Sequence, residues 1–142
     1  MADGLAFPNG MAVTPDNSTL IVAESYGGVL TAYDIGDDGS LSGRRVWADL
    51  AGAAPDGICL DAEGAVWFAE VPGHRCVRVA EGGAVRQIVE SDLGCFACML
   101  GGPDRRTLYV TAAAWPDAMT PGSRTGQILA ATVDVPGAGW PS

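Results

Sequence analysis

The stretch Pro55-Asp56-Gly57-Ile58-Cys59-Leu60-Asp61 places a carboxylate beside a glycine at the start of a short apolar run. The same pattern occurs earlier in the chain as Pro8-Asn9-Gly10-Met11-Ala12-Val13. A weaker copy, which lacks the proline and the glycine, occurs later as Phe96-Ala97-Cys98-Met99-Leu100. Three copies of one pattern indicate a repeat protein, because each copy would form the same structural unit.

A turn and a second apolar run follow each copy. The second runs span residues 19–24, 65–70 and 107–111. Aligning the copies puts Asn9, Asp56 and Ala97 at one structural position, with spacings of 47 and 41 residues. A repeat of this length that contains several short strands is typical of β-propeller blades and not of helical repeats.

The chain of 142 residues therefore predicts an all-β fold, a partial β-propeller over residues 1–142. Its three blades of four-stranded antiparallel sheet are expected at about residues 5–50, 51–92 and 93–142, although the third has no clear outermost strand. The 20 glycines and 9 prolines, which fall mostly between apolar runs, suit short strands joined by turns. Trp47, Trp67 and Phe68 are expected to pack between blades.

Three blades do not close a ring, since propellers usually have about four to eight. We expect half of a six-bladed propeller, with two blade faces left uncovered. Residues 20–23 and 66–69 are apolar at successive positions, as in strands covered on both faces. Either two copies associate as a homodimer, or a missing N-terminal half covers the open faces.

The charge and hydropathy of the chain exclude several classes of partner. The formal net charge of −9 argues against nucleic acid, because phosphates attract basic surfaces. No apolar run approaches the roughly 18 residues of a membrane span, and the start, Met1-Ala2-Asp3-Gly4, has no basic segment or apolar signal core. These features predict a soluble, cytoplasmic protein with no membrane partner.

The four cysteines are expected to be buried free thiols without disulfides. Cys59 and Cys76 lie in separate apolar strands, and Cys95 and Cys98 form a single C-x-x-C pair. A zinc site would need a second matched pair or nearby histidines, and His74 is the only histidine. A metal or redox site at these cysteines stays open as the alternative.

Taken together, these motifs resemble the SMP-30/gluconolactonase/LRE-like family of regucalcin-type sugar lactonases. The resemblance covers nearly the whole chain and corresponds to the C-terminal half of a family member. The order and spacing of the motifs agree as well as their residues. The motifs lie at residues 8–10, 22–25, 46–50, 55–58 and 96–102.

The resemblance implies a six-bladed propeller with one divalent metal ion at the mouth of its channel. It also implies the hydrolysis of small-molecule sugar lactones or related esters. Carried over by position, Asn9 and Asp56 would be metal ligands, and Asp56 would also be the catalytic general base. The family's third ligand, a glutamate from its first blade, and its substrate-binding residues have no counterpart here.

The two residue types suit this chemistry. Asn9 offers a neutral oxygen and Asp56 a charged one, and hard cations take oxygen ligands. Ca²⁺ is the first choice of metal, with Zn²⁺, Mn²⁺ and Mg²⁺ as alternatives. The ion would polarise a lactone carbonyl, and Asp56 would accept a proton from water. Gly10 and Gly57 would let the backbone turn close to the metal.

A purely structural interpretation of these residues stays open. Asn-Gly and Asp-Gly are common turn sequences, so Asn9 and Asp56 could serve only to start their strands. The chain would then be a non-catalytic propeller fragment that acts as a calcium-binding or interaction module.

Other polar and aromatic side chains are weaker candidates. Glu24 and Glu70 end equivalent second strands, where they would either face the mouth or lie in solvent. His74 is in a Pro-Gly-His turn, where a surface role is expected. Trp115 and Met119 lie in a long loop and would line a substrate entrance or belong to a plain surface loop.

Overall fold

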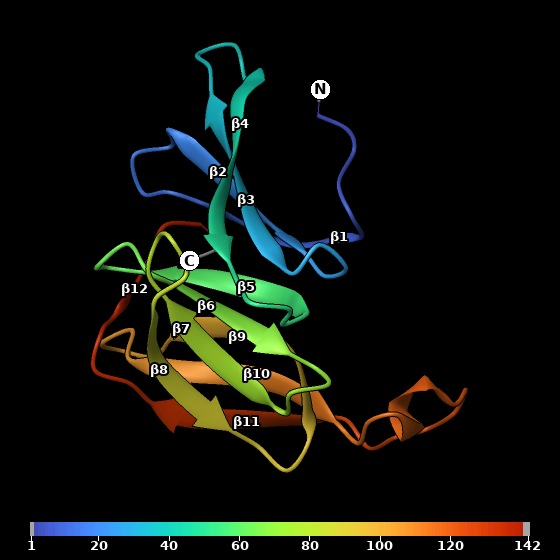
Figure 1. The fold of residues 1–142 in the computed structure, drawn as a ribbon. Helices are drawn as coiled ribbons and strands as arrows, with labels where there is room; N and C mark the ends of the chain where they lie inside the picture. The colour runs from blue at the N-terminus through green and yellow to red at the C-terminus, as the bar shows by residue number, and fades with distance from the viewer. Residues whose placement is uncertain (1, 141–142) are drawn as a thin grey trace.

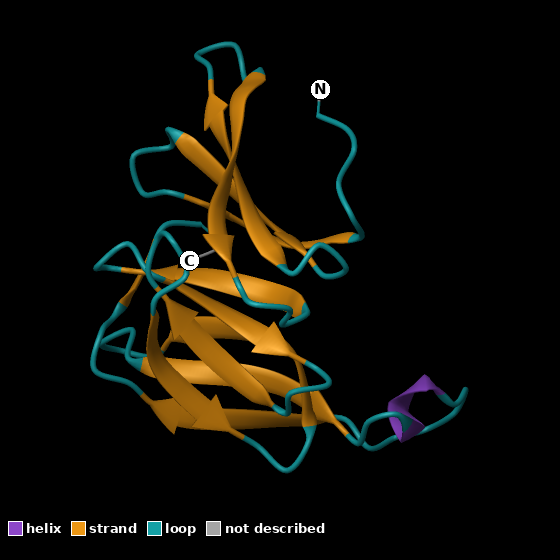
Figure 2. Ribbon diagram, in the orientation of Figure 1, coloured by secondary structure: helices purple, strands orange, loops and turns teal. Residues whose placement is uncertain are grey.

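The computed structural model describes residues 2–140, and these form three antiparallel β-sheets packed side by side (Figures 1 and 2). Sheet 1 contains β1 (Pro8–Val13), β2 (Thr19–Glu24), β3 (Val29–Ile35) and β4 (Leu41–Asp49). Sheet 2 contains β5 (Pro55–Asp61), β6 (Val66–Glu70), β7 (Arg75–Val79), β8 (Val85–Glu90) and β12 (Gly137–Ala138). Sheet 3 contains β9 (Gly94–Gly101), β10 (Thr107–Ala113) and β11 (Gln127–Thr132).

The strand content confirms the predicted all-β class but differs in detail from three equal blades. Only sheet 1 has four strands in chain order. Sheet 2 gains a fifth strand because β12 returns from the end of the chain and pairs with the free edge of β5. Sheet 3 has three strands, so β11 is an edge strand with no partner on its outer side among the described residues.

Side chains of the sequence fix the turns between strands. In the β5–β6 turn, a carboxylate oxygen of Asp61 accepts hydrogen bonds from the backbone N–H groups of Glu63 (2.9 Å) and Ala65 (3.0 Å). In the β1–β2 turn, Asp16 accepts from the N–H of Ser18 (3.0 Å) and Asn17 adopts a positive φ of 59°. Asp and Asn are favoured in turns for these two reasons.

Sheet 2 is covered on both faces, and its alternating side chains are divided between two hydrophobic cores. One set faces sheet 1 and packs with Ile21, Leu30 and Trp47. The opposite set faces sheet 3 and packs with Leu108 and Val110. The residues facing sheet 1 include Ile58, Leu60, Val66, Phe68, Val77 and Val79, and those facing sheet 3 include Cys59, Trp67, Ala69 and Cys76. The period of two in a strand explains why successive apolar residues are all buried.

The outer face of sheet 3 has no covering layer among residues 2–140, and that of sheet 1 is covered only in part, by the N-terminal segment that hydrogen-bonds to Glu24 and Arg44. In sheet 3, Leu108 and Val110 are buried while Tyr109, between them, points outward and is 41% exposed. Ile128 on the neighbouring strand is 69% exposed. In sheet 1, Met11 and Val46 are likewise exposed. These two faces are the open ends of the stack of sheets.

The remaining segments are a long loop and a short tail. The loop after β10 carries the one helical element of residues 2–140, the 3₁₀ turn Asp117–Met119, which projects from sheet 3 (Figure 2). No helix in this range is long and apolar enough to cross a bilayer. Besides the pairing of β12 with β5, the tail hydrogen-bonds to the end of β1 and to the turns that follow β5 and β9. Its bonds are Trp140 with Val13 (2.8 Å in both directions), Ala62 to Pro136 (2.8 Å) and Gly137 to Arg105 (2.9 Å).

Candidate metal and active site

The innermost strands β1, β5 and β9 lie next to one another, and each contains a β-bulge near its start. In β1 the pairing with β2 shifts between Pro8 and Met11, which leaves Asn9 in the irregular segment. In β5 the pairing with β6 shifts between Pro55 and Ile58, around Asp56. A bulge turns a side chain away from the regular alternation of the strand. Asn9 and Asp56 are therefore at equivalent positions, and we call this place the Asn9–Asp56 corner.

Gly10 and Gly57 bring the innermost strands together. A Cβ atom on Gly10 would lie 2.5 Å from the carbonyl oxygen of Asp56, and one on Gly57 would lie 2.6 Å from the Cβ of Ala97. Neither glycine has a positive φ. A left-handed backbone conformation is therefore not the reason for these glycines, and their role beside a metal stays a prediction. Their lack of a side chain is needed because adjacent strands approach closely.

The third copy of the pattern is aligned one residue away from the predicted register. In sheet 2, Pro55 pairs with Glu70 and Ile58 with Phe68. The matching pairs in sheet 3 are Cys95 with Ala112 and Cys98 with Val110. Phe96, rather than Ala97, thus occupies the position of Asp56. An aromatic ring cannot ligate a metal ion, so this corner contributes an apolar wall.

Asp56 is half-buried and has few polar neighbours. Burial raises the pKa of its carboxyl group, and a hydrogen bond from the side chain of Asn9 acts against this shift. Desolvation disfavours the charged form of a carboxyl group. An Asp with a raised pKa is a better proton acceptor than an ordinary one, provided that it is ionised at the working pH.

Ser25 holds the corner in place, and sequence reasoning did not single it out. Its hydroxyl donates a hydrogen bond to the carbonyl oxygen of Pro55 (2.7 Å), and the amide nitrogen of Asn9 lies 3.4 Å from the same hydroxyl oxygen. The side-chain oxygen of Asn9 is thereby left free. The position of Ser25 directly after β2 was the available signal, because β2 is the strand that pairs with β1.

Glu24 and Glu70 are neither ligands facing the mouth nor solvated strand ends. Both are buried and paired. Glu24 accepts hydrogen bonds from the N–H of Ala6 (2.6 Å) and the hydroxyl of Thr31 (2.5 Å), and forms an ion pair with Arg44 (3.3 Å). These contacts come from strands and segments distant in the sequence.

The other two ionisable candidates, Glu70 and His74, also have structural roles. Glu70 forms an ion pair with Nε of Arg75 at 2.6 Å, across the β6–β7 hairpin. His74 is in the turn of that hairpin, where it has a positive φ of 53° and is partly exposed. Its backbone, rather than its imidazole, is bonded: the carbonyl accepts from the N–H of Ser91 at 2.9 Å. These contacts fit a turn residue.

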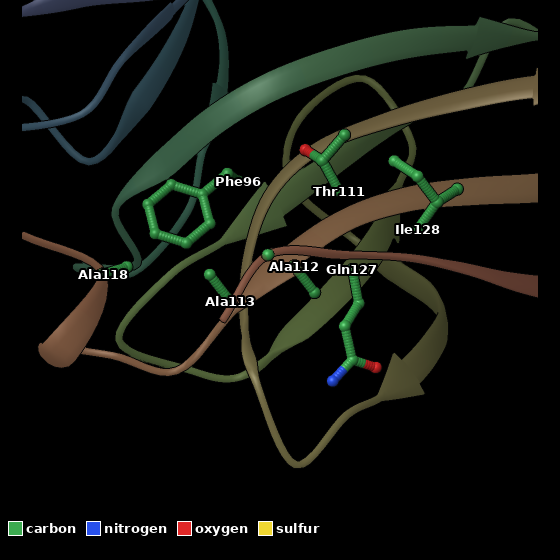
Figure 3. A pocket seen from close by; sticks show the side chains of 8 residues that line it. Phe96, Thr111, Ala112, Ala113, Ala118, Gln127 and Ile128 are labelled. Carbon is green, nitrogen blue, oxygen red and sulfur yellow. The ribbon is translucent and has the colours of Figure 1, made fainter. Parts of the chain in front are cut away.

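An apolar pocket of about 420 Å³ lies beside the Phe96 position (Figure 3). Its lining combines β9, β10 and β11 with the long loop. It includes Phe96, Thr111, Ala113, Ala118, Gln127 and Ile128. Trp115 packs edge-on against Phe96, with ring centroids 6.2 Å apart, and Met119 is exposed. The loop therefore contributes to a pocket wall through Ala118 and supports it through Trp115.

The donor set at the corner fits part of a hard-cation site. Asn9 and Asp56 supply oxygen atoms, the ligands that Ca²⁺ and Mg²⁺ prefer. Among residues 2–140, no three His, Cys, Asp or Glu side chains are grouped so that they could hold a metal ion. Since Ca²⁺ takes about six to eight oxygens, two residues leave most positions for other ligands.

Antiparallel sheets stacked side by side, with bulged innermost strands that share a polar corner, define a propeller-type protein. The family model described as the SMP-30/gluconolactonase/LRE-like region matches residues 1–114. The chain belongs to this family, which confirms the resemblance seen in the sequence motifs.

Two curated relatives illustrate the family. The 6-deoxy-6-sulfogluconolactonase of Pseudomonas putida is 29% identical over 155 aligned positions, which cover 99% of this chain and 51% of the relative. The regucalcin of Xenopus laevis is 34% identical over 116 positions, covering 78% of this chain and 39% of the relative. The chain thus spans about half of the length of one of these proteins and less of the other.

Solved structures support the same fold. A luciferin-regenerating enzyme superposes with a TM-score of 0.79 at 23% identity, covering 95% of this chain and 48% of its own. A calcium-binding regucalcin from Agrobacterium tumefaciens gives a TM-score of 0.76 at 23% identity, covering 94% and 48%. The fold of this chain is therefore that of SMP-30/regucalcin propellers, of which it spans about half.

Proposed function

We propose that this chain is the C-terminal half of a divalent-metal-dependent hydrolase of sugar lactones or related esters. The observation that carries the proposal is the equivalence of the bulges at Asn9 and Asp56. These bulges bring an amide oxygen and a carboxylate of raised pKa to one corner of neighbouring strands. Relatives named as lactonases, including a pentonolactonase of Haloferax volcanii, support this class of substrate.

Asn9 and Asp56 would hold the metal ion, with Ca²⁺ as the first choice. A divalent ion bound there would polarise the lactone carbonyl and stabilise negative charge on its oxygen. Asp56 would accept a proton from the attacking water, for which its partly buried carboxylate is suited. Ser25 would keep the amide of Asn9 oriented, because its own hydroxyl is fixed on the carbonyl of Pro55.

The overall reaction balances as a simple hydrolysis. The water oxygen bonds to the carbonyl carbon, and the ring C–O bond breaks. The ring oxygen leaves as an alcohol after receiving a proton, and the carbonyl carbon becomes a carboxylate. The apolar pocket beside Phe96 would cover part of the substrate, since sites for small molecules are concave and mostly apolar.

The site needs ligands beyond this chain. We propose that a second copy or a separate N-terminal half covers the open faces of sheets 1 and 3, completes a six-bladed ring and supplies the missing ligand. Exposed apolar residues on both faces support such a partner, including Val46 and Tyr109. Large exposed apolar patches commonly mark protein interfaces.

Calorimetric titration with Ca²⁺ and Mn²⁺ tests the corner directly. We expect weak binding by the chain alone, roughly in the millimolar range typical of sites with few charged ligands. Asp56→Ala should abolish it, whereas Asn9→Ala should weaken it. Asp56→Asn keeps an oxygen but loses the charge, so it should bind less tightly than the wild type. Asp37→Ala removes one carboxylate from an exposed turn and controls for the general negative charge.

The outcome of the titration also separates the two candidate functions. If wild type and Asp56→Ala bind equally, the corner is not a metal site and the hydrolase proposal fails. A pH-indicator assay then tests whether the chain, once associated with a second copy or an N-terminal half, hydrolyses gluconolactone. We expect turnover that Asp56→Ala removes and Asp37→Ala keeps.

A non-catalytic calcium-binding or interaction module is the second candidate. The small number of protein ligands at the corner favours it, because described residues offer no third acidic or histidine ligand. In that case Ca²⁺ would bind and depend on Asp56, but the associated form would not hydrolyse a lactone. Metal binding without turnover would therefore identify this function.

A further inference from the structure

All four cysteines are free, buried and gathered in the core between sheets 2 and 3. Cys59 and Cys76 come from β5 and β7, on the face of sheet 2 that is turned toward sheet 3. Cys95 and Cys98 come from β9 on the opposite side of the interface. Residues that are far apart in the sequence thus form one thiol cluster.

The bulge in β9 brings the C-x-x-C pair into this cluster. In a regular strand, residues three apart point to opposite faces of the sheet. The register of β9 shifts between Cys95 and Ala97, so Phe96 is an extra residue. Cys95 and Cys98 consequently face the same way, and both are buried against sheet 2.

Cys76 lies opposite both thiols of β9. The thiols of Cys95 and then Cys98 can donate hydrogen bonds to its sulfur, which lowers the pKa of Cys76 despite its burial. The same hydrogen bond to Cys76, together with burial, raises the pKa of Cys95. Among Cys76, Cys95 and Cys98, the thiolate is therefore favoured at Cys76, and the thiolate is the nucleophilic form of cysteine.

A cavity of about 320 Å³ distinguishes Cys95 from Cys98 as the partner of Cys76. Cys76 and Cys95 line it, between the edge strands β8 and β11. Cys98 is not among the lining residues, and its thiol donates to the carbonyls of Trp67 at 3.5 Å and Gly57 at 3.6 Å, while the thiol of Cys95 donates to the carbonyl of Leu93 at 3.7 Å. The other lining residues are Val89, Glu90, Ser91, Val110, Leu129, Ala130 and Ala131. A small oxidant in this cavity would meet Cys76 and Cys95 first.

We propose that Cys76 and Cys95 are an oxidisable thiol pair that hydrogen peroxide converts into a disulfide between sheets 2 and 3. The thiolate of Cys76 attacks one peroxide oxygen, the O–O bond breaks, and Cys76 becomes a sulfenic acid while hydroxide leaves and is protonated to water. The sulfur of Cys95 then attacks the sulfenic sulfur. The S–S bond forms, the S–O bond breaks, and a second water leaves with the Cys95 proton. Two thiols are oxidised and one peroxide is reduced.

Thiol counting and peptide mapping on the 142-residue chain test this proposal. The reduced protein is exposed to hydrogen peroxide, quenched with catalase, and alkylated with N-ethylmaleimide in denaturant. We expect the number of alkylated cysteines to fall from four to two. Trypsin cleaves after Arg75 and Arg78, which releases Cys76 in residues 76–78 and the C-x-x-C pair in residues 87–105. Fragmentation of the cross-linked peptide should place the bridge on Cys95.

Variants that each lack one cysteine test the assignment of the bridge without relying on the peptide map alone. Cys95→Ala should form no cross-linked peptide and should lose only the thiol of Cys76, which stops at the sulfenic acid, whereas Cys59→Ala and Cys98→Ala should still form the bridge. Four alkylated cysteines in oxidised wild type would overturn the proposal. It would equally fail if fragmentation placed the bridge on Cys98, or if Cys98→Ala lost the bridge while Cys95→Ala kept it.

Discussion

The close approach of the innermost strands makes Gly57→Ala a sharp test of the stacked sheets. A methyl group at this position would meet the Cβ of Ala97 at 2.6 Å and its Cα at 2.7 Å, and the carbonyl oxygen of Phe96 at 3.1 Å. Ala97 has no side-chain torsion that could move its Cβ away, and the other two atoms belong to the backbone. The clash can thus be relieved only if β5 and β9 move apart, which would also loosen the hydrophobic cores packed against them.

The expected loss of stability follows from this geometry. Inserting a methyl group into a closely packed site usually costs about 1–3 kcal/mol, and backbone neighbours that cannot rotate place this case at about 2–3 kcal/mol. For a domain of this size, each kcal/mol shifts the melting temperature by roughly 2–4 °C. Gly57→Ala should therefore melt roughly 4–12 °C below the wild type.

Gly126→Ala is the matched control. No atom lies within 4 Å of a Cβ built on Gly126, and its φ is not positive. Since alanine restricts the unfolded chain more than glycine, this variant should be unchanged or up to about 1 kcal/mol more stable. Thermal and urea unfolding, followed by circular dichroism at one protein concentration, would compare the three proteins. Equal melting temperatures for Gly57→Ala and wild type would refute the close contact of β5 with β9.

Three further expectations concern ion pairs and association. Arg78→Leu should lower the free energy of unfolding measured in urea by about 3–5 kcal/mol, because it removes the ion-pair partner that the buried Asp61 has at 2.5 Å. Arg45→Leu should lower it by less than about 1 kcal/mol, because the two side chains of that ion pair are 41% and 58% exposed. Burial would raise the pKa of Glu24, but its bonds to Ala6, Thr31 and Arg44 outweigh this and lower it. The stability that the ionised Glu24 gives to the folded chain is therefore complete above its ordinary pKa of 4.5, and it is lost as the pH falls through the lower pKa that Glu24 has in the folded state. Glu24→Gln should flatten the stability profile in that acidic range, and an unchanged profile would contradict the assignment. Light scattering after size exclusion should show association through the open faces of sheets 1 and 3, and a monodisperse monomer that binds no apolar dye would count against it.

Much of the fold was predictable because the strands carry strong local signals. Residues 66–69 are apolar at successive positions, which predicted a strand covered on both faces, and Trp67 and Phe68 indeed enter opposite cores. Trp47 packs between sheets 1 and 2 as expected. The Asn-Gly and Asp-Gly pairs marked equivalent places in two strands, since their flanking prolines and glycines made the alignment unambiguous.

The failures came from features without a local signal. The third copy lacks the proline and the glycine, so spacing alone set its alignment, and an error of one residue was enough to exchange Phe96 for Ala97. Glu24 and Arg44 pair across the sheet, and such long-range partners are not visible in a single sequence. The two-residue strand β12 has no apolar periodicity, and its pairing with β5 depends on the arrangement of the whole chain.

The tail that carries β12 also imposes an order on folding. Val13 exchanges two backbone hydrogen bonds with Trp140, almost the full length of the chain away. Until that segment has been synthesised, β1 and β5 can form their hairpins but keep bare edges. Contacts between such distant residues form late, because closing a long loop costs entropy before any contact repays it. A nascent chain with sheets 1 and 2 complete would thus present two strand edges that can pair with other chains, and residues 137–140 cover the ends of these edges at Val13, Leu60 and Asp61.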